Sequence, residues 1–126
     1  MRSCFLLLAA LSGLSGVALG AFGAHGLKTV LTPEMLAVYK TGVDYQMWHA
    51  LGLAIIAIFR QQVPESVQLK WAGWLMFSGI ILFSGSLYLL ATLNIKWLGM
   101  ITPFGGVCFL LAWALLAFFA YKPNDT

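Results

Sequence analysis

The sequence predicts an all-α fold, an integral membrane four-helix bundle with a short interfacial amphipathic helix before the second span. Two observations lead to this prediction. Of the 126 residues, 61% are hydrophobic and only 9% are charged, whereas soluble domains are about 25% charged. Long stretches also run without any charge, and a chain in lipid must satisfy its backbone hydrogen bonds internally, as a helix does. This composition excludes a soluble globular enzyme.

Four stretches are apolar enough to cross a bilayer, at about 4–24, 43–59, 71–93 and 99–121. Roughly 20 helical residues rise about 30 Å, which matches the hydrocarbon core. The second stretch is near the lower length limit and takes in Asp44, Gln46 and His49. No long linker divides the chain, so we expect a single transmembrane domain over 1–126.

The first stretch has an alternative interpretation as a cleavable signal peptide. Arg2 would form its charged start and Ala18-Leu19-Gly20 its small-residue cleavage site. However, the apolar run is longer than that of a typical signal peptide, and its small residues recur at helical spacing. These two features favour a retained membrane span.

The connector at 25–42 contains a strong helix start. In Thr32-Pro33-Glu34, the threonine suits the N-cap, the proline suits the first helical position, and the acid faces the positive end of the helix dipole. The apolar residues that follow share one face. We therefore expect an interfacial amphipathic helix from Pro33 that either bends at Gly42 or continues straight into the second span.

The basic residues indicate an orientation rather than a nucleic-acid partner. They are scattered along the chain, whereas a nucleic-acid footprint needs a clustered patch. With four spans, both termini and the second connector share one side, which carries Arg2, Arg60, Lys70 and Lys122. The opposite side carries Lys28, Lys40 and Lys96. The excess of four basic residues over three favours cytoplasmic termini in a bacterial inner membrane. The expected partners of the outer surface are membrane lipids.

Small residues recur along the spans where helices can approach closely. Helix association in lipid depends on such close backbone contact, since lipid supplies no hydrophobic driving force between helices. The first span has a small residue at every fourth position, and the third and fourth spans have similar sets. We expect helix packing at Ser12, Gly16, Gly20, Ala24, Gly79, Ser86, Gly105 and Gly106.

Polar side chains cluster at one rim of the predicted bundle. Threading four helices up and down places the ends of the first and third spans beside the starts of the second and fourth. Ionisable groups inside a membrane are costly and by default suggest function. The candidate polar pocket comprises His25, Asp44, Gln46, His49, Tyr88, Asn94 and Thr102.

The acid and the two histidines of this pocket also have purely structural interpretations. Asp44 could cap the second transmembrane helix or pair with Lys40 one turn earlier. His49 could be neutral and bonded to Tyr88, Ser84 or a backbone carbonyl, and His25 could simply be solvated at the end of its span.

The sequence indicates no catalytic residues, no metal site and no cofactor. A zinc site needs three or four ligands, and Cys4 and Cys108 lie at different depths. The one cofactor with any basis is a haem between His25 and His49, since imidazole suits iron. Proton-coupled transport would need an acid deep within a span, and Asp44 is at an edge.

Four stretches resemble a known family. They are ALGAFGAHGL at 18–27, TGVDYQMWHALGL at 41–53, LFSGSLYLLA at 82–91 and ITPFGGVCFLLAWALLAF at 101–118. Together they resemble the YgdD-like family of small multi-pass bacterial inner-membrane proteins, a domain of unknown function. The resemblance implies a four-helix plasma-membrane protein and carries over no catalytic residue.

We therefore expect a non-enzymatic membrane protein that acts through helix–helix or lipid contacts, as an accessory subunit or a homo-oligomer. The first alternative is a small oligomeric transporter or channel with a polar path lined by His49, Tyr88 and Thr102. The second is a redox accessory subunit that binds haem or quinone near His25 and His49.

Overall fold

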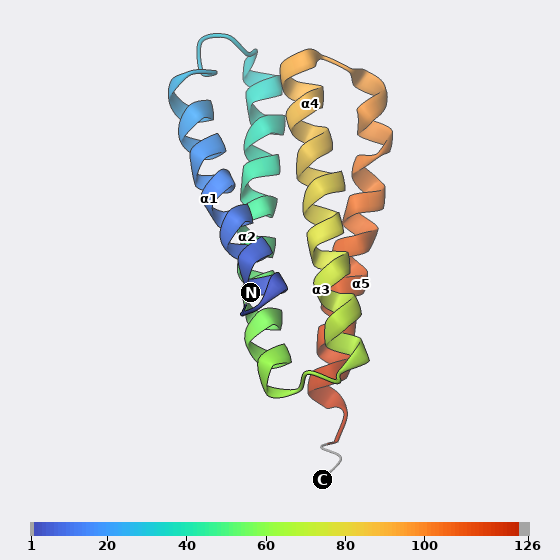
Figure 1. Cartoon of the computed structure of the whole chain (residues 1–126). Coiled ribbons are helices and arrows are strands. Elements are labelled where there is room, and N and C mark those ends of the chain that lie inside the picture. The colour runs from blue at the N-terminus through green and yellow to red at the C-terminus, as the bar shows by residue number, and fades with distance from the viewer. Residues whose placement is uncertain (1, 124–126) are drawn as a thin grey trace.

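The computed structural model describes residues 2–123 and is helical along nearly its whole length (Figure 1). Residues 1 and 124–126 of the predicted 1–126 domain lie outside the described residues. The elements in chain order are α1 (Cys4–His25), α2 (Pro33–Gln62), α3 (Val67–Gly79), the π-helical turn η1 (Ile80–Ser84), α4 (Gly85–Leu93), the 3₁₀ helix η2 (Lys96–Met100) and α5 (Thr102–Tyr121).

Four helical stretches of the described chain are long and apolar enough to cross a membrane, as predicted. They cover Cys4–His25, Pro33–Gln62, Val67–Leu93 and Lys96–Tyr121. The third joins α3, η1 and α4, and the fourth joins η2 and α5. The start of α1, the α2–α3 connection and the end of α5 lie together at what we call the lower end, as oriented in Figure 1.

The helices form two antiparallel pairs. Helix α1 packs along α2, and α5 packs along α3, while α2 also packs against α3, η1 and α4 and so joins the pairs (Figure 1). The main core contains residues from all four spans, among them Phe5, Leu53, Met76 and Phe109. A smaller cluster around Leu27, Tyr39 and Ala91 packs near the upper end.

Helix α2 begins as the sequence predicts and is longer than predicted. The Thr32 hydroxyl accepts a hydrogen bond from the Met35 amide at 3.2 Å, and Pro33 occupies the first turn. The amphipathic segment and the second span form one continuous helix, so the chain takes the straight alternative at Gly42. Gly42 is buried against the Tyr88 ring, so its lack of a side chain serves close packing inside a continuous helix.

The third span contains a feature that the sequence did not predict. At η1 the backbone forms one π-helical turn, in which the Gly85 amide donates to the Ile80 carbonyl. Such single turns inside α-helices are rare and often occur at functional sites. Here the turn ends at Ser84, whose side chain is fully buried.

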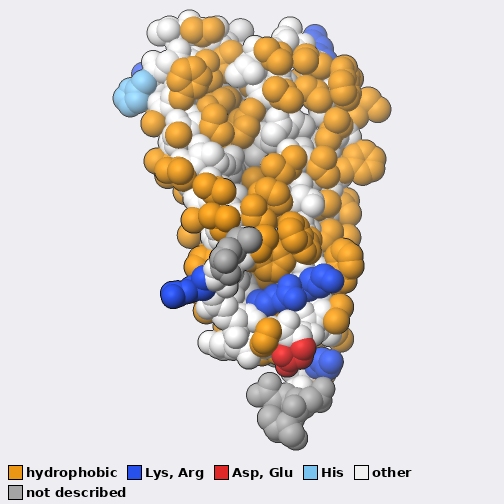
Figure 2. Space-filling model, viewed as in Figure 1, with side chains coloured by type: hydrophobic (Ala, Val, Ile, Leu, Met, Phe, Trp, Pro, Cys, Tyr) orange, Lys and Arg blue, Asp and Glu red, His pale blue; other side chains and the backbone are white. Residues whose placement is uncertain are grey.

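The outer surface of the bundle is apolar, as a lipid-facing surface must be. Large hydrophobic side chains are exposed on every span, among them Leu14, Leu51, Ile81 and Leu110. Figure 2 shows hydrophobic side chains over most of the visible face, with Lys and Arg side chains near the lower end. The molecule therefore has the surface of a membrane-embedded bundle.

Candidate functional site

The α1–α2 contact is made through glycines. A Cβ atom at Gly20 would lie 3.2 Å from Val43, one at Gly16 would lie 2.5 Å from the Met47 sulfur, and one at Gly23 would overlap the Tyr39 ring. Ser12 and Gly16 are buried in this contact, whereas Ala24 is exposed at its upper edge. The backbones can approach closely here because these positions lack side chains.

The contact of α5 with α3 and η1 also uses glycines. A Cβ atom at Gly105 would overlap the Phe83 backbone, and one at Gly79 would overlap the Phe109 ring. Gly106 is less tightly enclosed, because a Cβ atom there would lie 4.0 Å from its nearest neighbour, the Phe83 ring. Ser86, from the predicted packing set, is buried nearby.

Gln46 is the centre of a buried hydrogen-bond network. Its side-chain nitrogen donates to the Ser12 carbonyl at 2.8 Å and to the Ser15 hydroxyl at 2.9 Å. Its side-chain oxygen accepts a hydrogen bond from the Tyr88 hydroxyl at 2.6 Å. Both N–H donors and the oxygen of the side-chain amide thus have partners. The network ties α2 to α1 on one side and to α4 on the other.

Two further hydrogen bonds connect the remaining spans. The Ser84 hydroxyl donates to the Gly42 carbonyl at 2.6 Å, which links η1 to α2. The Ser86 and Thr102 hydroxyls lie 2.6 Å apart and link α4 to α5. Interhelical hydrogen bonds of this kind contribute about 0.6 kcal/mol each in membranes.

His49 is buried in an aromatic stack. Its Nδ1 atom lies 2.7 Å from the Tyr45 carbonyl, one turn earlier in α2. Its ring lies 3.5 Å, between centroids, from that of Phe109, nearly parallel to it, and also stacks with Tyr45. Of the expected partners, a backbone carbonyl is the one found. His49 thus contributes a flat packing surface between α2 and α5.

The structure does not gather the seven predicted pocket residues at one place. Gln46 and Tyr88 bond to each other, while Thr102 bonds to Ser86 instead. Three members of the set are exposed, namely His25, Asp44 and Asn94. Asn94 ends α4 with a left-handed backbone (φ 57°), a conformation that asparagine tolerates well.

Tyr39 was not among the predicted site residues, yet it is one of the most buried side chains. Its hydroxyl donates to the Leu19 carbonyl at 2.6 Å, and its ring lies 5.2 Å from that of Tyr88. The sequence signal available was its place on the apolar face of the amphipathic segment. The glycine opposite it, Gly23, is what makes room for the ring.

A small groove lies on the outer side of the α1–α2 pair. It has a volume of about 230 Å³. Small residues of α1 form one wall, and α2 contributes an acid and a base one turn apart. Its lining consists of Gly20, Gly23, Ala24, Tyr39, Lys40, Val43 and Asp44.

The placement of the two histidines does not suit one haem held by both. His25 is the last residue of α1, near the level where Gly23 meets Tyr39. His49 is ten residues beyond Tyr39 in α2, about 15 Å lower along the helix axis. Within residues 2–123, no three His, Cys, Asp or Glu side chains are grouped so that they could hold a metal ion.

Together these features define a multi-pass membrane protein whose polar side chains join its own helices. The chain belongs to a family described as "Protein of unknown function (DUF423)", whose model matches residues 19–106. It is 48% identical over 118 residues to the UPF0382 membrane protein YwdK of Bacillus subtilis (strain 168), which covers 94% of this chain and 96% of the relative. It is 46% identical to the UPF0382 membrane protein SAB0533 of Staphylococcus aureus (strain bovine RF122 / ET3-1), covering 94% of this chain and 95% of the relative.

These matches confirm the expected membrane family of unknown function, while the narrower YgdD-like resemblance stays a prediction. No solved structure matches the chain.

Proposed function

We propose that this protein is a non-enzymatic accessory protein of the bacterial inner membrane, with cytoplasmic termini, that binds a transmembrane helix of another chain. The binding face is the outer side of the α1–α2 pair, at the groove beside Asp44. The other chain is a second copy or a different membrane protein. The observation behind the proposal is the position of Asp44, an exposed acid on a membrane-spanning helix.

Asp44 lies within the expected hydrocarbon layer, close to its upper boundary. Between Lys40 and Arg60, α2 advances 20 residues, about 30 Å, which equals the thickness of that layer. Asp44 is one turn below Lys40, at a depth of about 6 Å. A carboxylate at such a site is costly unless a polar or basic group meets it. A helix seated in the groove would supply that group and cover the exposed Ala24.

The hydrogen bonds inside the bundle favour a binding role over a chemical one. Within the described residues, no buried side-chain nitrogen or oxygen lacks a hydrogen-bond partner. Gln46, Ser84 and Thr102 are used in joining helices, and His49 is enclosed by aromatic rings. A polar path between copies would need such groups on the outer surface, so the transporter alternative gains no support from their positions.

Site-specific photo-crosslinking in native membranes tests this proposal. A photoreactive residue replaces Ala24 at the groove or, as a control, Leu110, which is 71% exposed on the far helix α5. We expect a covalent adduct from position 24 and little from position 110. The adduct mass distinguishes a second copy from another protein. Asp44→Asn should reduce the adduct, whereas Glu34→Gln, at the exposed start of the same helix, should leave it unchanged.

Equal adducts from positions 24 and 110 would contradict the proposal, because they would report random collision in the membrane. An adduct at position 24 that persists undiminished in Asp44→Asn would show that the acid takes no part in the contact.

A further inference from the structure

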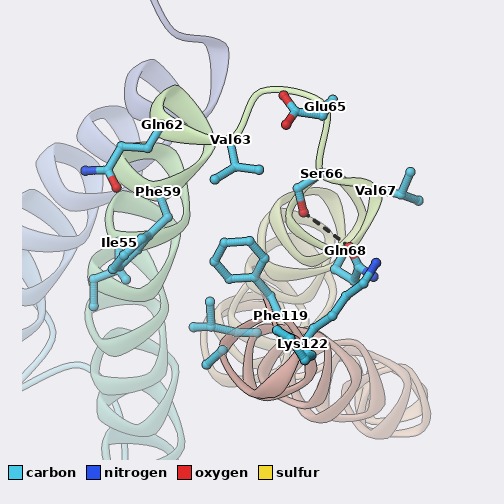
Figure 3. A pocket seen from close by; sticks show the side chains of 13 residues that line it. Ile55, Phe59, Gln62, Val63, Glu65, Ser66, Val67, Gln68, Phe119 and Lys122 are labelled. Carbon is cyan, nitrogen blue, oxygen red and sulfur yellow. Dashed lines mark hydrogen bonds between the residues drawn. The ribbon is translucent and has the colours of Figure 1, made fainter. Parts of the chain in front are cut away.

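An open crevice lies at the lower end of the bundle, between α2, α3 and α5 (Figure 3). Its volume is about 900 Å³. Phe119 extends from α5 toward Val63, and Glu65 lies in the connection at the rim (Figure 3). This site is separate from the α1–α2 groove, since α1 contributes no residue to it.

The crevice exists because α2 and α5 are held apart by aromatic rings. Higher in the bundle, the His49–Phe109 stack fills the gap between these helices, and Gly52 packs against the Trp113 ring. Below that level Phe59 of α2 meets Phe119 of α5 edge to face, with ring centroids 6.3 Å apart. The space between them therefore stays open toward the lower end.

The third wall is fixed by the start of α3. Ser66 is buried at the N-cap, accepts a hydrogen bond from the Leu69 amide at 3.2 Å, and donates one to the Gln68 side-chain oxygen at 3.3 Å (Figure 3). On the other side of the connection, the Arg60 guanidinium donates to the Pro64 carbonyl. These hydrogen bonds hold both ends of the α2–α3 connection at the rim of the crevice.

The lining changes from apolar to polar along the membrane normal. The inner part is formed by hydrophobic side chains, Ile55, Phe59, Leu116 and Phe119. The outer part contains the hydrogen-bonding or charged groups Gln62, Glu65, Gln68 and Lys122. Ile55 and Gln62 are seven residues apart, so this change takes place over about 10 Å. A ligand that fits must itself be apolar at one end and polar at the other.

The charge of the lower end favours an anionic headgroup. Four basic residues lie there within the described chain, Arg2, Arg60, Lys70 and Lys122, against the single acid Glu65. Figure 2 shows basic side chains on the surface near this end. Basic residues next to a span attract anionic lipids by about 1 kcal/mol each.

We propose that the crevice binds an anionic phospholipid of the surrounding bilayer. The first part of an acyl chain lies between Phe59 and Leu116, and the headgroup phosphate meets Lys122, with Gln62 and Gln68 as hydrogen-bond donors. A transmembrane helix fits less well, because an apolar helix crossing the bilayer would have to pass the polar outer part of the crevice, with Gln62, Glu65 and Lys122.

Native mass spectrometry of the full chain in a mild detergent tests this site. Phosphatidylglycerol is the anionic probe, and phosphatidylcholine of the same acyl composition is the zwitterionic one. We expect the wild-type protein to retain one phosphatidylglycerol in preference to phosphatidylcholine. Leu116→Trp, which fills the apolar part, should lose this adduct, and Lys122→Gln should reduce the preference about fivefold.

Matched controls keep the result specific. Leu110→Trp adds the same ring to the same helix outside the crevice, and Lys96→Gln removes one charge at the upper end. Both should behave as the wild type. Should Leu116→Trp fail to fold, as judged by its helical signal and melting, Ala120→Phe at the crevice wall replaces it.

Lipid retention by Leu116→Trp and Lys122→Gln equal to that of their controls would overturn the proposal. Loss of a dimer signal from Leu116→Trp, with lipid adducts unchanged, would show that a second copy occupies the crevice and would equally overturn it. Neither result bears on the crosslinking at position 24, so the two proposals fail or stand separately.

Discussion

At the scale of single residues, the stability of this bundle depends on polar groups that are fully paired inside an apolar body. Gln46 is 4% exposed and Tyr88 is half-buried, and each would be costly in lipid without its partner. The hydroxyl of Tyr88 and the amide of Gln46 therefore form a unit. Removing one partner leaves the other unsatisfied, which is more damaging than the loss of the bond alone.

Tyr88→Phe should accordingly destabilise the bundle by about 1 kcal/mol, because it leaves the Gln46 side-chain oxygen without its donor. The change keeps the ring and hence its packing against Tyr39. Unfolding by denaturant in detergent micelles measures the difference. Tyr121→Phe is the control, since Tyr121 is 86% exposed and should lose nothing. Equal midpoints for the two variants would contradict a stabilising role of the network.

The individual partners in this site were only partly predictable. The sequence placed Gln46, His49 and Tyr88 in neighbouring parts of the bundle, because the alternating direction of the helices determines which ends of the spans lie side by side. It could not decide which atoms meet, since this depends on the rotation of each helix about its axis. The Ser15 hydroxyl and the Ser12 carbonyl became partners of Gln46 only through the close α1–α2 approach.

At the scale of elements, the glycines of α5 and α1 are not equivalent. Gly105 faces the Phe83 backbone, which cannot move aside as a flexible side chain can, whereas a Cβ atom at Gly13 would meet no neighbouring atom within 4 Å. Small-residue patterns in a sequence do not separate these two environments. The contact partner on the neighbouring helix decides the effect of a substitution.

Gly105→Ala should therefore destabilise the protein by about 1–3 kcal/mol, the usual effect of forcing one extra methyl group into a packed contact. Gly13→Ala should be neutral or slightly stabilising, because alanine favours helix and no neighbour is displaced. Thermal unfolding in one detergent, followed by circular dichroism, compares the two. A melting temperature lowered more by Gly13→Ala than by Gly105→Ala would show that the contact between α5 and η1 is not the tight one.

The elements themselves were largely predictable, and the exceptions have physical reasons. The start of α2 was visible because Thr32 and Pro33 are local signals that act within one helical turn. The π-helical turn at η1 was not, because no residue type marks it and the Ser84–Gly42 hydrogen bond that accompanies it joins residues 42 positions apart. The length of α2 beyond the predicted 43–59 arises because a helix can continue outside the hydrocarbon layer.

At the scale of the whole molecule, the two ends differ in charge and in shape. The lower end has Arg2, Arg60, Lys70 and Lys122 and the open crevice, whereas the upper end has Lys28, Lys40 and Lys96 and is closed by the cluster around Tyr39. A margin of one positive charge is small for setting the orientation of a four-span protein.

This small margin makes the orientation sensitive to few substitutions. Reporter fusions near residue 123 should place the C-terminal end of the wild-type chain in the cytoplasm, because the side with more Lys and Arg residues is retained there. Arg2→Gln combined with Lys70→Gln leaves two basic residues below and three above, so we expect a mixed or inverted population. Lys28→Gln combined with Lys96→Gln leaves four against one and should keep a single orientation. A periplasmic reporter on the wild-type chain would mean that another determinant sets the orientation, and the crevice would then face the outer leaflet. An unchanged single orientation after Arg2→Gln and Lys70→Gln would also show that the count of basic residues does not set it.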